Sequence, residues 1–267
     1  MFKSPGEIAL SIGPLNIHWY GIIICVAFLS GLFVTLKIAK LKGLNEEKQD
    51  VIIDLSSILL ITGIIGARLY YVIFNWSYYS KNLLEIIQVY QGGLSIHGAL
   101  IGGFLAALVY SKIKKFNLLQ FVDIYSPGIA LGQSIGRWGN FFNSEAFGLP
   151  TNLPFKLFIP LENRPVEYSQ SLYFHPTFLY ESILDFALFV FLFYMLKNNK
   201  TSQHGQIFAL YLLIYSIIRL FIESLRIDSV ASVLGMPLAQ FISILLIITA
   251  AGMLYYVTVL KKSLDRS

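Results

Sequence analysis

The chain has 267 residues, of which 56% are hydrophobic and only 13% are charged. Its mean hydropathy of +0.66 is too high for a water-soluble globular domain, so composition excludes that class and predicts an integral membrane protein. The net charge of +5 follows from basic residues clustered between apolar runs, and nucleic acid is not an expected partner. The single cysteine, Cys25, allows neither an internal disulfide nor a Cys/His metal site.

Seven apolar runs approach or exceed the roughly 20 residues that a helix needs to cross a bilayer. They cover residues 17–36, 51–74, 95–110, 119–137, 178–196, 206–225 and 238–260. The runs lack the strict alternation of a transmembrane barrel. The sequence therefore predicts an all-α integral membrane protein in which residues 1–267 form a single domain of seven transmembrane helices.

The basic residues predict how these helices are oriented. Twelve of them follow alternate runs and thus share one side: Lys37, Lys40, Lys42, Lys48, Lys112, Lys114, Lys115, Lys197, Lys200, Lys261, Lys262 and Arg266. Because cytoplasmic segments carry an excess of Lys and Arg, we expect the N-terminus outside and the C-terminus in the cytoplasm. The outer segment 138–177 contains five of the nine prolines and is predicted to be a loop or arm.

Three arginines, Arg68, Arg137 and Arg219, lie inside apolar runs or at their ends. With a rise of about 1.5 Å per residue, each lies near the outer end of its helix, at the depth of Tyr20 and His97. An arginine at the bilayer centre costs about 2.5–3.5 kcal/mol. We therefore expect these five side chains to face a shared polar cavity in the outer part of the membrane.

The segment Gly136-Arg-Trp-Gly-Asn-Phe-Phe-Asn-Ser-Glu-Ala-Phe-Gly148 adds polar groups at this depth. Asn140, Asn143 and Glu145 follow Arg137 at a transition from helix to loop, where glycines permit turns that expose backbone donors to an anion. A guanidinium presents a planar fork of donors that matches phosphate. This pattern indicates a phosphate-binding site.

Each charged residue also has a structural interpretation. Arg137 could extend from a helix end toward lipid headgroups, and Arg219 could form a salt bridge with Glu223, four residues later on the same helical face. Arg68 could pair with Glu145 or Glu223. These alternatives remain open from the sequence.

His97 lies in Gly92-Gly-Leu-Ser-Ile-His-Gly98. A lone histidine in an apolar helix is commonly a hydrogen-bonding group between helices, but its ordinary pKa also suits proton transfer near neutrality. Its depth and the flanking glycines favour the second role. Asn140 and Asn143 either bind a polar headgroup or cap the helix end.

At these residues the chain resembles the prolipoprotein diacylglyceryl transferases of bacterial inner membranes. The resemblance rests on the segment 136–148 and on shorter matches in the same order along the chain. These are His18-Trp-Tyr-Gly21, Gly66-Ala-Arg68, Gly92 to Gly98, His175-Pro-Thr-Phe-Leu-Tyr-Glu181, and the set Tyr215, Arg219, Glu223 and Arg226.

The resemblance implies transfer of the sn-1,2-diacylglyceryl group from phosphatidylglycerol to the lipobox cysteine thiol of a preprolipoprotein, forming a thioether and releasing glycerol phosphate. It implies a multi-pass protein of the bacterial cytoplasmic (inner) membrane with its active site toward the outer leaflet. The expected partners are the lipid bilayer, phosphatidylglycerol and preprolipoprotein signal peptides that carry a lipobox cysteine. The reaction requires no cofactor and no metal.

For this reaction His97 is the expected base or proton relay, and Arg137 and Arg219 are expected to stabilise the departing phosphate. The expected substrate-binding residues are Arg137, Tyr20, Arg68, Asn140, Asn143, Glu145, Gly148, Tyr215 and Glu223. One alternative is a non-catalytic phospholipid transporter or scramblase, in which the arginines guide headgroups without bond cleavage. Another is a structural or receptor-like helical protein.

Overall fold

The computed structural model describes residues 1–13, 15–198, 203–227 and 232–260. The chain forms two compact units, which are described separately. The first comprises Met1–Lys42 and Val122–Ser267, and the second comprises Gly43–Phe121. Four basic residues assigned above to the cytoplasmic side lie outside the described residues: Lys200, Lys261, Lys262 and Arg266.

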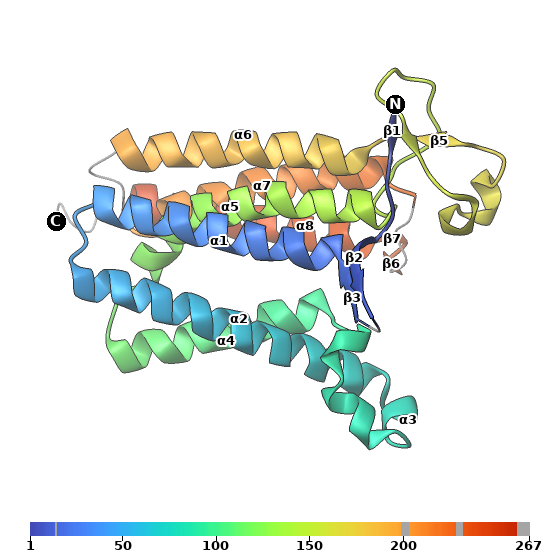
Figure 1. Ribbon diagram of the computed structural model, residues 1–267. Helices are drawn as coiled ribbons and strands as arrows, with labels where there is room; N and C mark the ends of the chain where they lie inside the picture. The colour runs from blue at the N-terminus through green and yellow to red at the C-terminus, as the bar shows by residue number, and fades with distance from the viewer. Residues whose placement is uncertain (14, 199–202, 228–231, 261–267) are drawn as a thin grey trace. The chain divides into compact units, whose positions relative to one another are not determined.

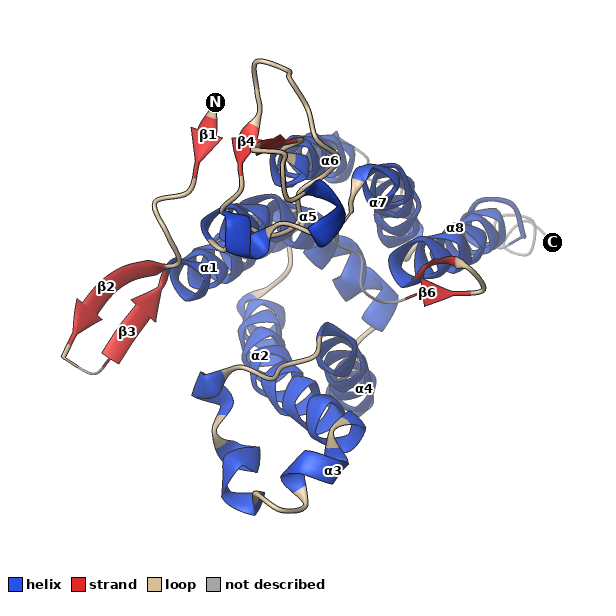
Figure 2. Ribbon diagram, turned by 90° about the vertical axis from the view of Figure 1, so that its right-hand side faces the viewer, coloured by secondary structure: helices blue, strands red, loops and turns tan. Residues whose placement is uncertain are grey.

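The first unit is a bundle of long helices that share a common direction (Figure 1), and Figure 2 shows them end on. The helices are α1 (Trp19–Leu41), α5 (Leu118–Phe142), α6 (Thr177–Asn198), α7 (Gln206–Leu225) and α8 (Leu238–Tyr255), which continues as a short π-helix, η5 (Tyr256–Leu260). Helix α6 packs on α7, and α7 packs on α8.

Six of the described helices are long and apolar enough to cross a membrane. They are Trp19–Leu41, Glu46–Phe74, Ile96–Lys114, Thr177–Asn198, Gln206–Leu225 and Leu238–Val259. These six match six of the seven runs predicted from the sequence, so a mostly helical membrane protein is confirmed. The seventh run, 119–137, forms α5 but is not among the six, because polar residues such as Asp123, Gln133 and Arg137 interrupt it.

Helix α5 tolerates these polar residues because other parts of the protein cover it. Of its 25 residues, only Leu119, Ile129 and Trp138 are exposed. The hydroxyl of Ser134 donates a hydrogen bond of 2.8 Å to the carbonyl of Ser182 on α6, which returns an equivalent bond of 2.8 Å. A helix whose polar groups bind neighbouring helices does not have to be apolar on every face.

Two glycines allow α1 and α5 to approach closely. A Cβ atom on Gly128 would lie 2.5 Å from the carbonyl oxygen of Gly31, and one on Gly31 would lie 2.8 Å from the carbonyl oxygen of Gly128. Both distances are too short for any larger residue, so the crossing requires glycine on both helices.

Asp123 on α5 fixes the start of α7. Its carboxylate accepts hydrogen bonds from the backbone N–H groups of Gly205 at 2.7 Å and Phe208 at 2.8 Å. The first N–H groups of a helix have no partner within that helix, and a carboxylate also complements the positive end of its dipole. This contact aligns α7, which carries Arg219, with α5, which carries Arg137.

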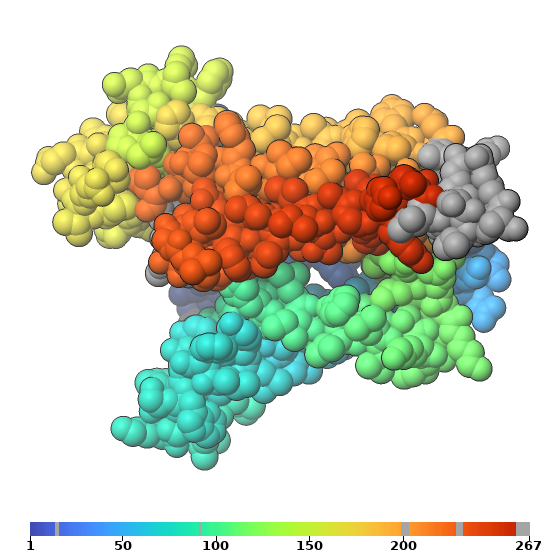
Figure 3. Space-filling view, turned by 180° about the vertical axis from the view of Figure 1, so that it is seen from behind, coloured from blue at the N-terminus to red at the C-terminus, as the bar shows by residue number. Residues whose placement is uncertain are grey.

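The segment 138–177, predicted above to be a loop or arm, is a folded substructure. Strands β4 (Leu157–Phe158) and β5 (Tyr173–Phe174) pair antiparallel, and β1 (Phe2–Lys3) adds parallel to β4, giving the order β1-β4-β5. The short helices η3 (Leu161–Asn163) and η4 (Val166–Tyr168) lie between β4 and β5. Figure 3 shows this segment in yellow and yellow-green, projecting beyond the ends of α7 and α8.

The sheet has its own hydrophobic core, which joins it to the helices. The core consists of Phe147, Leu157, Ile159, Phe174 and Phe178, of which Phe178 belongs to α6. Two hairpins precede helices of the same unit. Strands β2 (Ile8–Ile12) and β3 (Leu15–His18) precede α1, while β6 (Ser232–Val233) and β7 (Met236–Pro237) precede α8.

The second unit is built on α2 (Glu46–Phe74) and α4 (Ile96–Lys114), which pack along much of their length. Glycines again allow the approach, because a Cβ atom on Gly102 would lie 2.6 Å from the carbonyl oxygen of Thr62. The connection contains α3 (Trp76–Tyr79), η1 (Leu83–Ile87) and η2 (Val89–Gln91).

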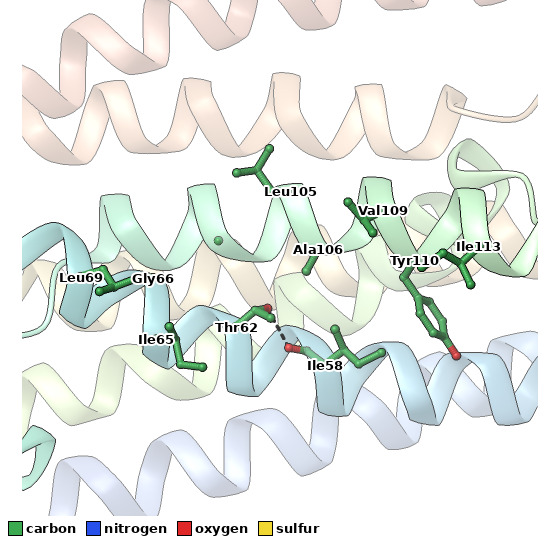
Figure 4. Close-up of a pocket in the computed structure, with 11 residues that line it drawn as sticks. Ile58, Thr62, Ile65, Gly66, Leu69, Leu105, Ala106, Val109, Tyr110 and Ile113 are labelled. Atoms are coloured by element: carbon green, nitrogen blue, oxygen red, sulfur yellow. Dashed lines mark hydrogen bonds between the residues drawn. The ribbon is translucent and has the colours of Figure 1, made fainter. Parts of the chain in front are cut away.

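An apolar groove of about 480 Å³ runs between α2 and α4. Figure 4 shows aliphatic side chains of both helices along it, and Thr62 directs its hydroxyl to the carbonyl of Ile58 at 2.7 Å. The groove therefore offers almost no polar group. None of the charged residues singled out in the sequence lines it.

We expect Gly128→Ala to lower the free energy of unfolding by about 1–3 kcal/mol, because the added methyl group collides with the α1 backbone. The matched control is Gly252→Ala on α8, where an added Cβ has nothing within 4 Å. That variant should be neutral or slightly stabilising, since alanine favours helix. Thermal unfolding of the purified proteins in detergent compares the two, and equal unfolding temperatures would contradict the close crossing.

Candidate active site

Two of the predicted arginines meet on one carboxylate. Nη2 of Arg137 lies 2.5 Å from Oε1 of Glu181, and Nη1 of Arg219 lies 3.2 Å from Oε2 of the same residue. Glu181 is only 2% exposed. A single buried carboxylate thus joins a guanidinium from α5 to one from α7.

The ion pairs continue along α7. Nη2 of Arg219 lies 2.7 Å from Oε2 of Glu223, and Nη1 of Arg226 lies 3.9 Å from the same oxygen. The salt bridge between Arg219 and Glu223 is therefore present. Three guanidinium groups alternate with two carboxylates, and we call these five residues, Arg137, Glu181, Arg219, Glu223 and Arg226, the arginine cluster. Its net charge is +1.

Helix periodicity explains how the sequence assembles the cluster. Tyr215, Arg219 and Glu223 are spaced by four residues and share one face of α7. Arg137 lies near the end of α5, and Glu181 lies in the second turn of α6. These positions fall at the end of the bundle from which the segment 138–177 leaves (Figure 1).

Tyr20 belongs to the same end of the first unit. Its ring packs on Gly139 of α5, where a Cβ atom would lie 2.7 Å from the ring. The side chain is 40% exposed, and it interacts electrostatically with Glu145 and Arg137. A phenol that is open to its surroundings and close to a guanidinium can donate to an oxygen of a bound headgroup.

The polar segment at the end of α5 folds back on itself. The side-chain amides of Asn140 and Asn143 donate to Oε1 of Glu145 at 2.8 and 3.3 Å. The residues on either side of that glutamate, Ser144 and Ala146, have φ values of 54° and 56°. Residues other than glycine rarely adopt this conformation, which is concentrated at functional sites. The turn holds the Glu145 carboxylate against the two asparagines.

Gly148 lies where three segments meet. Its N–H donates to the carbonyl of His175 at 2.9 Å, and a Cβ atom would lie 2.8 Å from the carbonyl oxygen of Leu225. Close packing accounts for a glycine here, and substrate binding by Gly148 stays a prediction.

Tyr215 connects the cluster to a second layer of polar groups. Its hydroxyl interacts electrostatically with the guanidinium of Arg137, and its ring stacks on that of Tyr211 at 5.9 Å between centroids. The hydroxyl of Tyr211 donates to Oε1 of Gln133 at 3.0 Å. Tyr215 thus links Arg137 to Tyr211 and Gln133.

Arg68 lies in the second unit, where its partners are backbone carbonyls. Nε donates to Ile86 at 2.8 Å, Nη1 donates to Gly92 at 2.7 Å and Gly93 at 3.0 Å, and Nη2 donates to Glu85 at 2.5 Å. Four of its five N–H groups are thus used to hold the loop that precedes α4. Pairing of Arg68 with Glu145 or Glu223, and its predicted contact with substrate, stay predictions.

His97 also lies in the second unit, in the first turn of α4. Its ring is half-buried, and its centroid lies 5.9 Å from that of Tyr70 on α2. The structure therefore brings together the three predicted residues of the first unit, namely Tyr20, Arg137 and Arg219. Convergence of all five stays a prediction.

Sequence reasoning left two acidic residues of α6 without a role, although both carry clear signals. Glu181 and Asp185 are the only charged residues in the predicted run 178–196, and their spacing of four puts them on one helical face. A pair of acids in an apolar helix points to basic partners on neighbouring helices. Among the described residues, no group of three or more His, Cys, Asp or Glu side chains is placed to hold a metal ion.

The fold and site define a multi-span helical membrane protein with a buried arginine cluster at one end of its helices. Comparison with known proteins names the class more closely. Residues 7–256 match the family of prolipoprotein diacylglyceryl transferases. The chain belongs to this family.

Curated relatives named phosphatidylglycerol–prolipoprotein diacylglyceryl transferase align over nearly the whole chain. The protein of Trichormus variabilis is 49% identical over 91% of this chain and 86% of its own length. That of Prochlorococcus marinus subsp. pastoris is 46% identical over 91% and 89%. That of Synechocystis sp. is 43% identical over 98% and 93%.

We expect Glu181→Gln to destabilise the protein by about 3–5 kcal/mol, because it leaves two buried guanidinium groups without their shared counter-charge. Thermal unfolding in detergent measures this change. The control is Glu162→Gln in η3, which removes an exposed carboxylate. If both variants unfold at the wild-type temperature, Glu181 does not hold the cluster together.

Proposed function

We propose that the arginine cluster binds the phosphate of phosphatidylglycerol while the sn-1,2-diacylglyceryl group is transferred to the lipobox cysteine thiol of a preprolipoprotein. The products are a thioether on the peptide and glycerol phosphate. Family membership makes this chain a diacylglyceryl transferase. The observation that carries the finer proposal is the buried bridge in which Glu181 joins Arg137 to Arg219.

The charge of the cluster suits a phosphodiester. Three guanidiniums and two carboxylates leave one positive charge, and phosphatidylglycerol brings one negative charge. Arg137 and Arg219 are each less than one-fifth exposed, so little water competes for their donors. Because Glu181 already fixes both side chains, they need no reorganisation when charge develops on the phosphate.

The reaction needs a base and a stabilised leaving group. The peptide thiol, with an ordinary pKa of about 8.5, loses its proton to become the nucleophile. The thiolate attacks the glycerol carbon next to the phosphate, and the carbon–oxygen bond breaks with its electrons moving to phosphate oxygen. The phosphate thereby gains one negative charge, which Arg137 and Arg219 stabilise. We assign the thiol proton to His97, whose role rests on its sequence position and on the family resemblance.

The remaining predicted residues serve the headgroup. Tyr20 and the amides of Asn140 and Asn143 offer hydrogen bonds to the free glycerol, while Glu145 orients the amides. Tyr215 and Glu223 position Arg137 and Arg219 and complete the binding site. We place Arg68 and Gly148 in the same set on the strength of the resemblance.

The membrane arrangement is part of the proposal. Seven helices would cross the bacterial cytoplasmic membrane as one domain, with the N-terminus outside and the C-terminus inside. Two observations support an active site toward the outer leaflet. Basic residues gather at the opposite ends of the helices, and the cluster lies where the long segment 138–177 leaves the bundle. There the site would meet the lipobox cysteine of a translocated signal peptide.

The test is a transfer assay with purified protein, labelled phosphatidylglycerol and a synthetic lipobox peptide. We expect lipid-modified peptide and released glycerol phosphate in equal amounts. A peptide with serine in place of the lipobox cysteine is the control, because it lacks the nucleophile. Lipid movement between leaflets without a thioether product would instead support a scramblase.

Arg137→Lys should lower kcat/KM for phosphatidylglycerol by about 100-fold or more, because a point charge cannot replace a fork of donors held by Glu181. The matched control is Arg164→Lys in the outer segment. There the guanidinium donates to the carbonyls of Ile159 at 2.8 Å and Ser169 at 3.0 Å and lies over the Phe158 ring, with its centre 5.7 Å from the ring centroid. Similar losses in both variants would argue against phosphate binding by Arg137.

His97→Gln should lower kcat at neutral pH by about 100-fold, the usual size of a general-base contribution. The loss should shrink as the pH rises toward about 9, because the thiol then ionises without help from the enzyme. Kinetics at several pH values, with thermal unfolding to verify folding, measure both effects. A variant with normal kcat at neutral pH would remove His97 from the role of base.

A further inference from the structure

Asp185 is a carboxylic acid that the proposed mechanism does not use. It lies on α6, one turn after Glu181. It is therefore further than Glu181 from Thr177, where the helix starts. The residue is 0% exposed, and within the described ranges neither carboxylate oxygen has a hydrogen-bond partner. An ionised carboxylate without water or donors is strongly disfavoured in such surroundings.

The groups around Asp185 come from three helices. The charges that act on it are those of Glu181 on its own helix, Arg137 on α5 and Arg219 on α7. Tyr211 and Tyr215 on α7 also interact with it, and they are neutral near pH 7. Among the described residues, α1 contributes no charged group to this set.

Both arginines near Asp185 already have closer partners. Arg137 pairs with Glu181 at 2.5 Å, and Arg219 pairs with Glu181 at 3.2 Å and Glu223 at 2.7 Å. The guanidiniums therefore do not form the salt bridge that an ionised Asp185 would require, whereas a protonated Asp185 requires none.

We propose that Asp185 is a neutral carboxylic acid in the resting enzyme and that its proton keeps the arginine cluster at a net charge of +1. Ionisation would add a negative charge, bring the total to zero and remove the attraction for a phosphodiester anion. Asp185 is thus a positioning residue that sets the charge of the phosphate site, and this role rests on the function proposed above.

The sign of the pH dependence follows from this charge count. Phosphatidylglycerol binds best while Asp185 is protonated, and its binding weakens as the pH rises through the range in which Asp185 ionises. At an effective dielectric constant of about 20, one unit charge within about 10 Å of the phosphate changes binding by about tenfold or more. Asparagine has the same shape and stays neutral, so Asp185→Asn should remove the pH dependence.

The experiment measures KM for phosphatidylglycerol over a pH series that begins at neutral pH and runs upward, in the wild type and in Asp185→Asn. We expect KM of the wild type to rise about tenfold, KM of the variant to change less than about twofold, and both proteins to be equally active at neutral pH. The control is Asp50→Asn at the start of α2, an exposed carboxylate whose loss should leave the wild-type pH dependence intact.

A second measurement does not depend on catalysis. The infrared difference spectrum between wild type and Asp185→Asn at neutral pH should contain the carbonyl band of a protonated carboxylic acid. Absence of that band, an inactive Asp185→Asn, or a variant with the wild-type pH dependence would each overturn the proposal. Failure of the wild type to form thioether would instead overturn the proposed function, so the two failures are distinguishable.

Discussion

The structure depends on one carboxylate shared by two arginines. Charged groups are expensive in surroundings that contain little water, and Glu181 makes Arg137 and Arg219 tolerable there by pairing with both. Because the three residues come from α5, α6 and α7, the same contact that neutralises charge also sets the relative positions of these helices. The site and the first unit are therefore stabilised by the same interaction, and weakening one weakens the other.

Helix α5 shows how a membrane protein keeps polar residues away from lipid. Glycines bring α1 against one side of it, reciprocal serine bonds hold α6, and Asp123 caps the start of α7. With its surface covered, α5 carries Arg137 at its far end and continues into the strained turn that holds Glu145. The surrounding helices must therefore be apolar on their outer faces. The interior helix α5 does not have to be, so it can carry polar residues of the site.

The cluster combines a fixed geometry with an incomplete charge balance. Its carboxylates hold the guanidiniums in place but leave one positive charge, which the phosphodiester anion of the proposed function would balance. The buried, unpartnered Asp185 is placed where its protonation state changes that balance. In the proposed function, the same preorganised donors would both bind the phosphate and stabilise it as it departs.

The sequence by itself predicted seven membrane spans, of which six are confirmed as candidates, together with the arginines that needed an explanation and a signature for the family that the comparisons confirm. Composition and helical period are local properties, so they predict which segments are apolar and which residues share a face. Only the tertiary structure decided that Glu181 is the common partner of two arginines, that Arg68 holds a loop through four carbonyls, and that α5 is covered by protein. These facts depend on the rotation and register of helices distant in sequence, which close packing at glycines and pairing of buried charges determine together.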